Sequence, residues 1–180
     1  MIRGQRVVLR TVRQTDLAAL YLLVNDRSLQ GEHLALPLRS EPSFRKEFEE
    51  TGFLGERRGR FLVTDLDDRT LGMVVYFSVN YMDGVEVGYQ MFDAGSRNKG
   101  LMTEALRLAV RHLFASHKIN RLQIATAVDN EASKHLALKC GFRLEGTLRG
   151  NVFHHGHNRD SLLYSLLRDD AAATVPTGAA

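Results

Sequence analysis

Residues 84–105 read GVEVGYQMFDAGSRNKGLMTEA and form the most informative segment of the sequence. It predicts a strand, a short basic loop containing glycine, and the first turn of an amphipathic helix. A helix N-terminus presents backbone N–H groups without intrahelical partners, together with the positive end of the helix dipole. The small and basic residues from Gly95 to Gly100 lead into that terminus and can close over a phosphate. The pattern therefore predicts an anion site, with a pyrophosphate favoured. An ordinary strand-to-helix connection is the alternative.

The loop differs from two common phosphate-binding motifs. A P-loop ends in Gly-Lys-Ser/Thr, whereas here Lys99 precedes Gly100 and no such triplet follows. The dinucleotide fingerprint needs three spaced glycines, which this loop does not supply. Neither motif therefore accounts for the predicted anion site.

The loop carries a family resemblance. The run Arg97-Asn98-Lys99-Gly100-Leu101-Met102 resembles the acyl-CoA pyrophosphate motif of the GNAT acetyltransferase superfamily. Met102 replaces the small last residue of that motif. More narrowly, residues 86–89 (EVGY) and 100–106 (GLMTEAL) resemble the ribosomal-protein N-terminal acetyltransferases, the RimJ/RimL group. Further along the chain, that group's Asn-x-x-Ser, Gly-Phe and Glu-Gly pattern is matched by residues 130–133 (NEAS), 139–142 (KCGF) and 145–146 (EG).

The composition limits the class of protein. A chain of 180 residues can bury a sizeable core, and we expect one domain over residues 1–170 with a disordered tail over 171–180. No apolar run is long enough to span a bilayer and the first residues lack an apolar signal core, so we expect a cytoplasmic protein with no membrane partner. The single cysteine, Cys140, excludes an internal disulfide and a multi-cysteine metal site. The net charge of +3 suits anionic coenzyme A and is weak for a nucleic-acid-binding face.

Hydrophobic patterning predicts the elements. The broadest apolar stripe lies on the helix that follows the loop, which we place at residues 101–117. Strand, helix and strand around the loop imply a parallel pair. We predict an α+β fold, with a mixed, mostly antiparallel central sheet of about seven strands, a splayed parallel pair and flanking helices, as in GNAT proteins. The stripe consists of Met102, Ala105, Leu106, Ala109, Val110 and Leu113. The expected strands are 7–11, 60–65, 71–79, 85–92, 121–128, 144–153 and 160–167, and the other expected helices are 15–25 (with Thr15 as cap), 43–52 and 130–140.

The resemblance implies a coenzyme site. Backbone N–H groups from Asn98 to Met102 would hold the pyrophosphate, with charge from Arg97 and Lys99. The pantetheine arm would pair with the preceding strand, where one N–H would serve as oxyanion donor. Gly88 inside that strand fits a bulge or splay that frees these groups, or is simply a strand glycine. The predicted coenzyme-binding residues are Gln90, Met91, Phe92, Arg97, Asn98, Lys99, Gly100, Leu101, Met102, Thr103, Asn130 and Ser133.

Glu86 is the leading candidate for the general base. Alternation places it on the face of Gly88 and Gln90, and the superfamily often has a carboxylate there that acts through water. A solvated or salt-bridged strand glutamate is the alternative.

A second glutamate that RimL-type proteins carry after the Glu-Gly pair is absent, because Val152 stands at its position. His154, His155 and His157 lie just beyond and could take its place, although a histidine-rich hairpin tip is equally ordinary. We expect no metal, because nothing nearby completes a ligand set.

Ser133 is the candidate acid for the leaving thiolate. It matches the serine that the ribosomal group uses in this role, and Asn130 matches the residue that bonds the pantetheine amide. Both residues also suit the first turn of a helix as capping residues. We expect no catalytic role for Cys140, which is best explained as a small buried hydrophobe.

The resemblance to the GNAT and RimJ/RimL proteins implies an acetyl-CoA-dependent N-acetyltransferase. The acceptor would be the N-terminal α-amine of a ribosomal or other protein or peptide, attacking the thioester directly in a ternary complex. The resemblance also implies that the N-terminal helical pair shapes the acceptor site, and that a homodimer forms in many relatives. Two alternatives stay open: a small-molecule amine acceptor, for which Glu47, Glu49 and Glu50 hint at polyamines, and a non-catalytic acyl-CoA-binding module.

Overall fold

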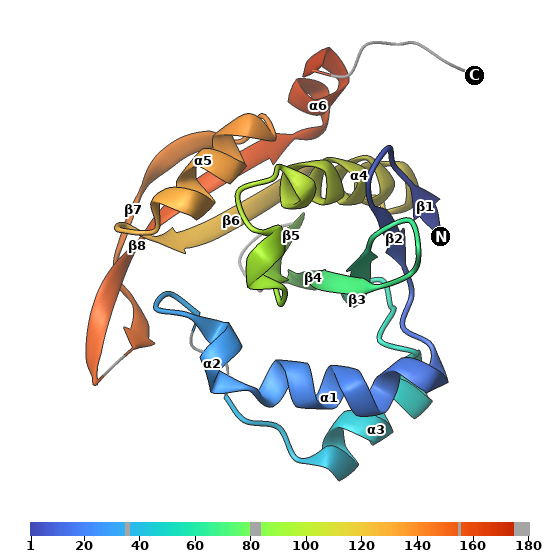
Figure 1. Cartoon of the computed structure of the whole chain (residues 1–180). Helices are drawn as coiled ribbons and strands as arrows, with labels where there is room; N and C mark the ends of the chain where they lie inside the picture. The colour runs from blue at the N-terminus through green and yellow to red at the C-terminus, as the bar shows by residue number, and fades with distance from the viewer. Residues whose placement is uncertain (35–36, 80–83, 155, 175–180) are drawn as a thin grey trace. The chain divides into compact units, whose positions relative to one another are not determined.

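The computed structural model describes residues 1–34, 37–79, 84–154 and 156–174. Within these ranges eight strands form one sheet in the hydrogen-bonded order β1-β2-β3-β4-β5-β6-β8-β7 (Figure 1). The strands are β1 (Ile2–Arg3), β2 (Val8–Arg10), β3 (Arg58–Thr64), β4 (Thr70–Ser78), β5 (Gly84–Met91), β6 (Arg121–Ala127), β7 (Arg143–His154) and β8 (His157–Leu167). The α-helices are α1 (Leu17–Asn25), α2 (Arg27–Gln30), α3 (Glu41–Thr51), α4 (Leu101–Ser116), α5 (Glu131–Lys139) and α6 (Arg168–Thr174), with 3-10 turns η1 (Gln14–Asp16) and η2 (Ala94–Ser96).

The predicted fold class is confirmed. The sheet is mostly antiparallel, and β5 and β6 form its parallel pair. The strand that the sequence analysis omitted is β1, whose two residues are too few to show any alternation. All six positions of the stripe predicted for α4 are buried. Among the described residues, no helix is both long and apolar enough to cross a membrane.

The chain divides into two compact units. Unit 1 comprises residues 1–77 and 88–109, and unit 2 comprises residues 78–87 and 110–180. The expectation of one domain over residues 1–170 therefore stays a prediction. Helix α6 covers part of the tail for which disorder was expected, and residues 175–180 lie outside the described part.

The core of unit 1 lies between α1, α3 and one face of its strands (Figure 1). Three aromatic rings meet there: the centroids of Phe44 and Phe53 lie 4.8 Å apart, and those of Phe48 and Phe53 lie 5.5 Å apart. Such tilted contacts stabilise a core beyond the apolar area that they bury. Leu62 and Met73 join the cluster from β3 and β4, and Phe92 joins it from the residue after β5.

Two predicted helix starts are wrong in detail. Thr15 lies inside the 3-10 turn η1 and caps no helix, because Asp16 precedes α1. Helix α3 starts at Glu41, since Ser40 is its N-cap and accepts a hydrogen bond from Ser43 N at 3.4 Å. Serine at the cap with proline in the first turn is a favourable helix start, so of the two serines the earlier one is the cap.

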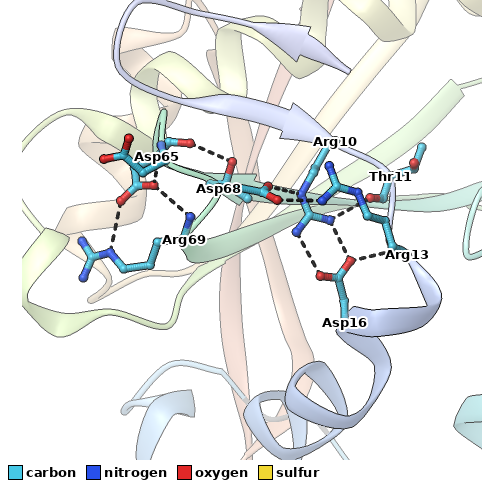
Figure 2. A network of polar contacts seen from close by, with 9 residues as sticks. Arg10, Thr11, Arg13, Asp16, Asp65, Asp68 and Arg69 are labelled. Carbon is cyan, nitrogen blue, oxygen red and sulfur yellow. Dashed lines mark hydrogen bonds and ion pairs between the residues drawn. The ribbon is translucent and has the colours of Figure 1, made fainter.

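A buried arginine joins the end of β2 to α1 and to the β3–β4 turn (Figure 2). The Arg10 side chain is 5% exposed and binds both carboxylate oxygens of Asp16, at 2.7 and 2.9 Å. Its Nε donates to Asp68 Oδ1 at 2.6 Å, and Arg13 donates to the other oxygen of Asp68. The two carboxylates thus satisfy a guanidinium that would be costly to bury alone.

The same network perturbs Asp16. Burial acts to raise the pKa of this carboxyl, but the hydrogen bonds from Arg10 and from the Arg13 N–H, with the charges of both arginines, outweigh it and hold the pKa below its usual value. A carboxyl whose folded-state pKa is depressed contributes stability above its unfolded pKa, and that stability is lost as pH falls.

In unit 2, two arginines tie strands and helix ends together. Arg168 donates to the carbonyls of Phe114 (2.5 Å), His117 (3.0 Å) and Ile119 (2.6 Å), so it closes the C-terminal end of α4. Arg121 on β6 binds both carboxylate oxygens of Glu145 on β7. Helix α5 lies over these strands in Figure 1 and ends at the buried Cys140.

We predict that Arg10→Met destabilises the protein by about 2–3 kcal/mol, somewhat less than the loss of one partner of a fully buried ion pair, because Asp16 and Asp68 can hydrate. Asp68→Asn should cost less, since this carboxylate is half exposed. Urea unfolding at pH 7 measures both. The gap between wild type and Arg10→Met should narrow as pH falls below the unfolded pKa of Asp16 toward its depressed folded-state pKa. A gap that does not change with pH would contradict the role given to the Arg10–Asp16 pair.

Candidate active site

The predicted anion loop lies in unit 1, between the end of β5 and α4. Asp93 shapes its first half: Oδ1 accepts from Gly95 N at 2.9 Å and Oδ2 accepts from Ser96 Oγ at 2.6 Å. The loop then turns through the left-handed region at Asn98 (φ 60°) and Gly100 (φ 74°). Asparagine and glycine tolerate this region best, so the residue types fit the backbone.

The loop faces solvent with its charges outward. Arg97, Asn98, Lys99 and Gly100 are all exposed. Arg97 makes a long hydrogen bond of 3.5 Å to the carbonyl of Met91. Met102 is buried, so its backbone and not its side chain could meet a ligand. The exposed cations and the helix start therefore combine in one place, as an anion site requires.

Glu104 anchors the N-terminal segment against the first turn of α4. Its Oε1 accepts from the backbone N–H groups of Gln5 (2.5 Å) and Arg6 (2.9 Å), and its Oε2 accepts from Arg6 Nε at 3.2 Å. Arg6 Nη1 in turn donates to the carbonyl of Lys99 at 3.0 Å. The sequence analysis missed this cluster, because nothing local marks a contact between residues 98 positions apart.

The partners of Glu104 also set its charge state. Burial acts to raise its pKa, but the hydrogen bonds from Arg6 and Gln5 and the charge of Arg6 outweigh burial and lower the pKa. The carboxylate is therefore ionised and neutralised by Arg6. It places no uncompensated negative charge beside the loop.

The three residues predicted to meet the pantetheine, Gln90 and Met91 at the end of β5 and Phe92 just after it, differ in what they offer. The N–H of Phe92 donates to Leu71 O at 2.9 Å and its ring lies in the core, which leaves its carbonyl for the coenzyme. Gln90 is 6% exposed and its Nε2 donates to Leu29 O at 3.1 Å. Met91 is half buried.

The parallel ladder between β5 and β6 is short. It pairs Gly84 with Arg121, Val85 with Leu122 and Glu86 with Gln123, whereas β5 continues to Met91. This ladder agrees with the predicted splay. Gly88 lies beside Val75 on the other neighbour, since a Cβ there would stand 3.1 Å from Val75 Cγ2.

Glu86 lies in unit 2, where β5 meets β6. Gln123, which is fully buried, donates from Nε2 to Glu86 Oε2 at 2.7 Å. Burial raises the pKa of Glu86, and the Gln123 hydrogen bond opposes that rise without cancelling it. A carboxylate with a raised pKa is a stronger proton acceptor, which suits a general base.

Asn130 and Ser133 also lie in unit 2, at the start of α5. Asn130 is the N-cap, and its Oδ1 accepts from Ser133 N at 3.1 Å, so the capping interpretation of this motif is confirmed. Ser133 is 8% exposed. Their roles toward a coenzyme stay predictions.

The histidines lie at the tip of the β7–β8 hairpin, where His154 pairs with His157 and Val152 pairs with Arg159. His155 falls outside the described residues. Among the described residues, no group of three histidine, cysteine or acidic side chains is arranged to hold a metal ion.

The motif glutamate Glu145 has a structural role. It accepts from Arg121 Nη1 at 2.8 Å and from Ser165 Oγ at 2.6 Å. The hydrogen bonds from Arg121 and Ser165 lower the pKa of Glu145 to about 2. It therefore stays ionised as a fixed ion pair between β6, β7 and β8, and it is a poor proton acceptor.

Comparison with known proteins shows the family. The family described as "Acetyltransferase (GNAT) domain" matches residues 6–143, which is most of the chain. The chain therefore belongs to the GNAT acetyltransferases.

Relatives within the family act on different acceptors. Probable N-acetyltransferase YjcK of Bacillus subtilis (strain 168) is 32% identical over 111 residues, a match that spans 61% of each chain. The ribosomal-protein-serine acetyltransferase of Escherichia coli (strain K12) is 26% identical over 171 residues, covering 92% of this chain and 95% of that protein, which confirms the resemblance to the RimJ/RimL group. The spermidine N-acetyltransferase of Vibrio cholerae, solved with CoA and spermine, has a TM-score of 0.81 at 22% identity over 94% of this chain and 99% of that one. At that identity the likeness concerns the fold.

We predict that Gly100→Glu abolishes coenzyme A binding. The substitution adds bulk and negative charge beside the exposed cations, at a φ of 74° that side chains rarely adopt. Calorimetric titration with coenzyme A measures the effect. Gly52→Glu is the matched control, because it carries similar strain (φ 61°) at the end of α3 with nothing within 4 Å. Micromolar binding retained in Gly100→Glu would contradict the loop assignment.

Proposed function

We propose that this GNAT protein transfers the acetyl group of acetyl-CoA to the N-terminal α-amine of a protein or peptide. The observation that carries the proposal is the anion loop: two left-handed turns and two exposed cations at the start of α4, the longest helix described. The near full-length match to a ribosomal-protein-serine acetyltransferase supports the choice of acceptor.

The proposed reaction needs few groups from the protein. The amine nitrogen attacks the thioester carbonyl carbon, the C–S bond breaks, and coenzyme A leaves as a thiolate. Glu86 takes the proton of the amine through a water molecule. An α-amine has an ordinary pKa of about 8, against about 10.4 for lysine, so a carboxylate with a raised pKa suffices.

The leaving group needs little help. A thiol ionises near pH 8.5, so the thiolate departs readily. Ser133 is the proposed donor of a hydrogen bond or proton to this sulfur, and Asn130 is the proposed partner of the pantetheine amide. We assign both roles from their place in the family motif.

A second candidate function is acetylation of a polyamine. It is favoured by the fold shared with the Vibrio cholerae spermidine N-acetyltransferase. A third, a binding module without turnover, follows from the absence of the late glutamate, at whose position Val152 stands.

Thiol release from acetyl-CoA, measured against spermidine, free amino acids and short peptides, separates these candidates. We expect turnover with peptides whose α-amine is free and none after that amine is blocked. Turnover with spermidine alone would replace the proposed acceptor. Tight acetyl-CoA binding without thiol release in the presence of any acceptor would contradict the proposed transferase activity.

We predict that Glu86→Gln lowers kcat by about 100-fold or more, the usual contribution of a general base. Wild-type kcat/KM should fall as pH drops through the raised pKa of Glu86, because the protonated carboxyl cannot accept a proton. Gln123→Leu removes the donor that stabilises the carboxylate, so the fall should move to higher pH.

Glu145→Gln is the control for Glu86→Gln, because both remove a strand carboxylate from unit 2. It should keep its activity and pH profile while losing thermal stability at neutral pH. Equal loss of kcat in both variants would show that Glu86, too, acts through stability.

A further inference from the structure

Arg60 on β3 is a partly buried cation, and two of its side-chain nitrogens lack hydrogen bonds. Its Nε and Nη1 are buried and have no hydrogen-bond partner among the described residues. The guanidinium lies over the ring of Phe53 (4.5 Å to the centroid) and over that of Phe44 (5.6 Å). Burial lowers its pKa to about 10. The rings stabilise the charge but accept no conventional hydrogen bond.

The charges around Arg60 do not compensate it. Glu47 is the acidic group that acts on it, but this carboxylate is already bound to Arg39 Nη2 at 2.5 Å. Arg39 and Arg58 both repel the Arg60 charge. Three arginines thus share one glutamate, and the surroundings of Arg60 disfavour a polycation and favour an anion.

The strand register places Arg60 on the face that carries Gln90. Arg60 pairs with Val75 across β3 and β4, and Gly88 lies beside Val75. Gln90, two residues beyond Gly88 on β5, is on the same face by alternation. Its Oε1 is buried and lacks a partner among the described residues, although its Nε2 is bound to Leu29.

This face of unit 1 therefore holds two unmatched kinds of group. The Arg60 nitrogens can donate to a carboxylate, and Gln90 Oε1 can accept from an N–H. Gly88 has no side chain, and a Cβ there would stand 3.1 Å from Val75 Cγ2, so Val75 is the side chain that lies between the two groups. A buried polar group left without a partner costs free energy, so such groups are normally satisfied.

We propose that Arg60 is a specificity-determining residue that binds a carboxylate of the acceptor, so that the protein selects N-terminal peptides with aspartate or glutamate near the amine and rejects polyamines. This inference rests on the proposed function, of which it names the acceptor class. The strands that carry Arg60 and Gln90 are two spacings apart, about 10 Å. That distance is the reach of about three extended residues, which places the acidic residue within the first three.

The test compares peptides that are identical except for Asp or Asn at one of the first three positions. For the wild type we expect kcat/KM to be at least about 10-fold higher with Asp at the preferred position, mainly through KM, and spermidine and free aspartate to be poorer acceptors. In Arg60→Gln the kcat/KM for the Asp peptide should fall to that for the Asn peptide, while the kcat/KM for the Asn peptide should change little.

Two further variants separate specificity from folding. Arg45→Gln removes the same charge from the outer side of α3, where Arg45 pairs with Glu41, and should keep the preference for Asp. Arg60→Lys keeps the charge and should keep part of the preference if Arg60→Gln proves unstable. Acetyl-CoA binding and thermal unfolding confirm that each variant is folded.

Direct binding of the same peptides, measured with coenzyme A present, tests the role of Arg60 in acceptor binding independently of turnover. An Asp peptide that binds through Arg60 but is not acetylated would support this inference and contradict the proposed function. Equal losses for Asp and Asn peptides in folded Arg60→Gln would overturn it, since Arg60 would then only support the fold. A wild type that prefers spermidine, or binds Asp and Asn peptides equally, would overturn it as well.

Discussion

Three hydrogen bonds onto the carboxylate of Glu104 hold the N-terminal segment against the first turn of α4, where the anion loop ends. Arg6 spans the junction, because it binds Glu104 on the helix and the carbonyl of Lys99 in the loop. An acidic residue in the first helical turn stabilises the helix through the positive end of its dipole, but its negative charge would repel a bound anion. Neutralising it with a neighbouring arginine keeps the first effect and removes the second.

Polar side chains elsewhere divide into a hydrogen-bonded set and a set with unsatisfied atoms. Arg10 and Glu145 have complete sets of partners and hold strands and turns in place. Arg60 and Gln90 keep atoms without partners, and burial outweighs the one hydrogen bond recorded for Glu86. Stability comes from the first set, whereas the second set keeps charge and hydrogen-bonding capacity for a ligand. This division is expected where a protein gives up local stability at functional positions.

Much of the fold could be predicted because its signals are local. The stripe on α4 repeats every three or four residues, and the β3–β4 hairpin has an acidic turn between two largely apolar strands. The errors arose where several cap-forming residues stand together. Thr15 and Asp16 both suit a cap, and Asp16 takes that place, although its carboxylate binds Arg10 and caps no N–H of α1. The contact between Arg6 and Glu104 could not be predicted, since it joins distant segments. The position of Arg60 could not be predicted either, because a basic residue on a strand normally faces water.

The buried position of Cys140 makes the chain convenient for spectroscopy. This thiol is 8% exposed at the end of α5, and the sequence contains no other. Buried thiols in apolar surroundings react slowly with alkylating reagents. A cysteine introduced on the solvent face of α3 or α5 would therefore react first, so one fluorophore or spin label could be attached there without removing the native thiol.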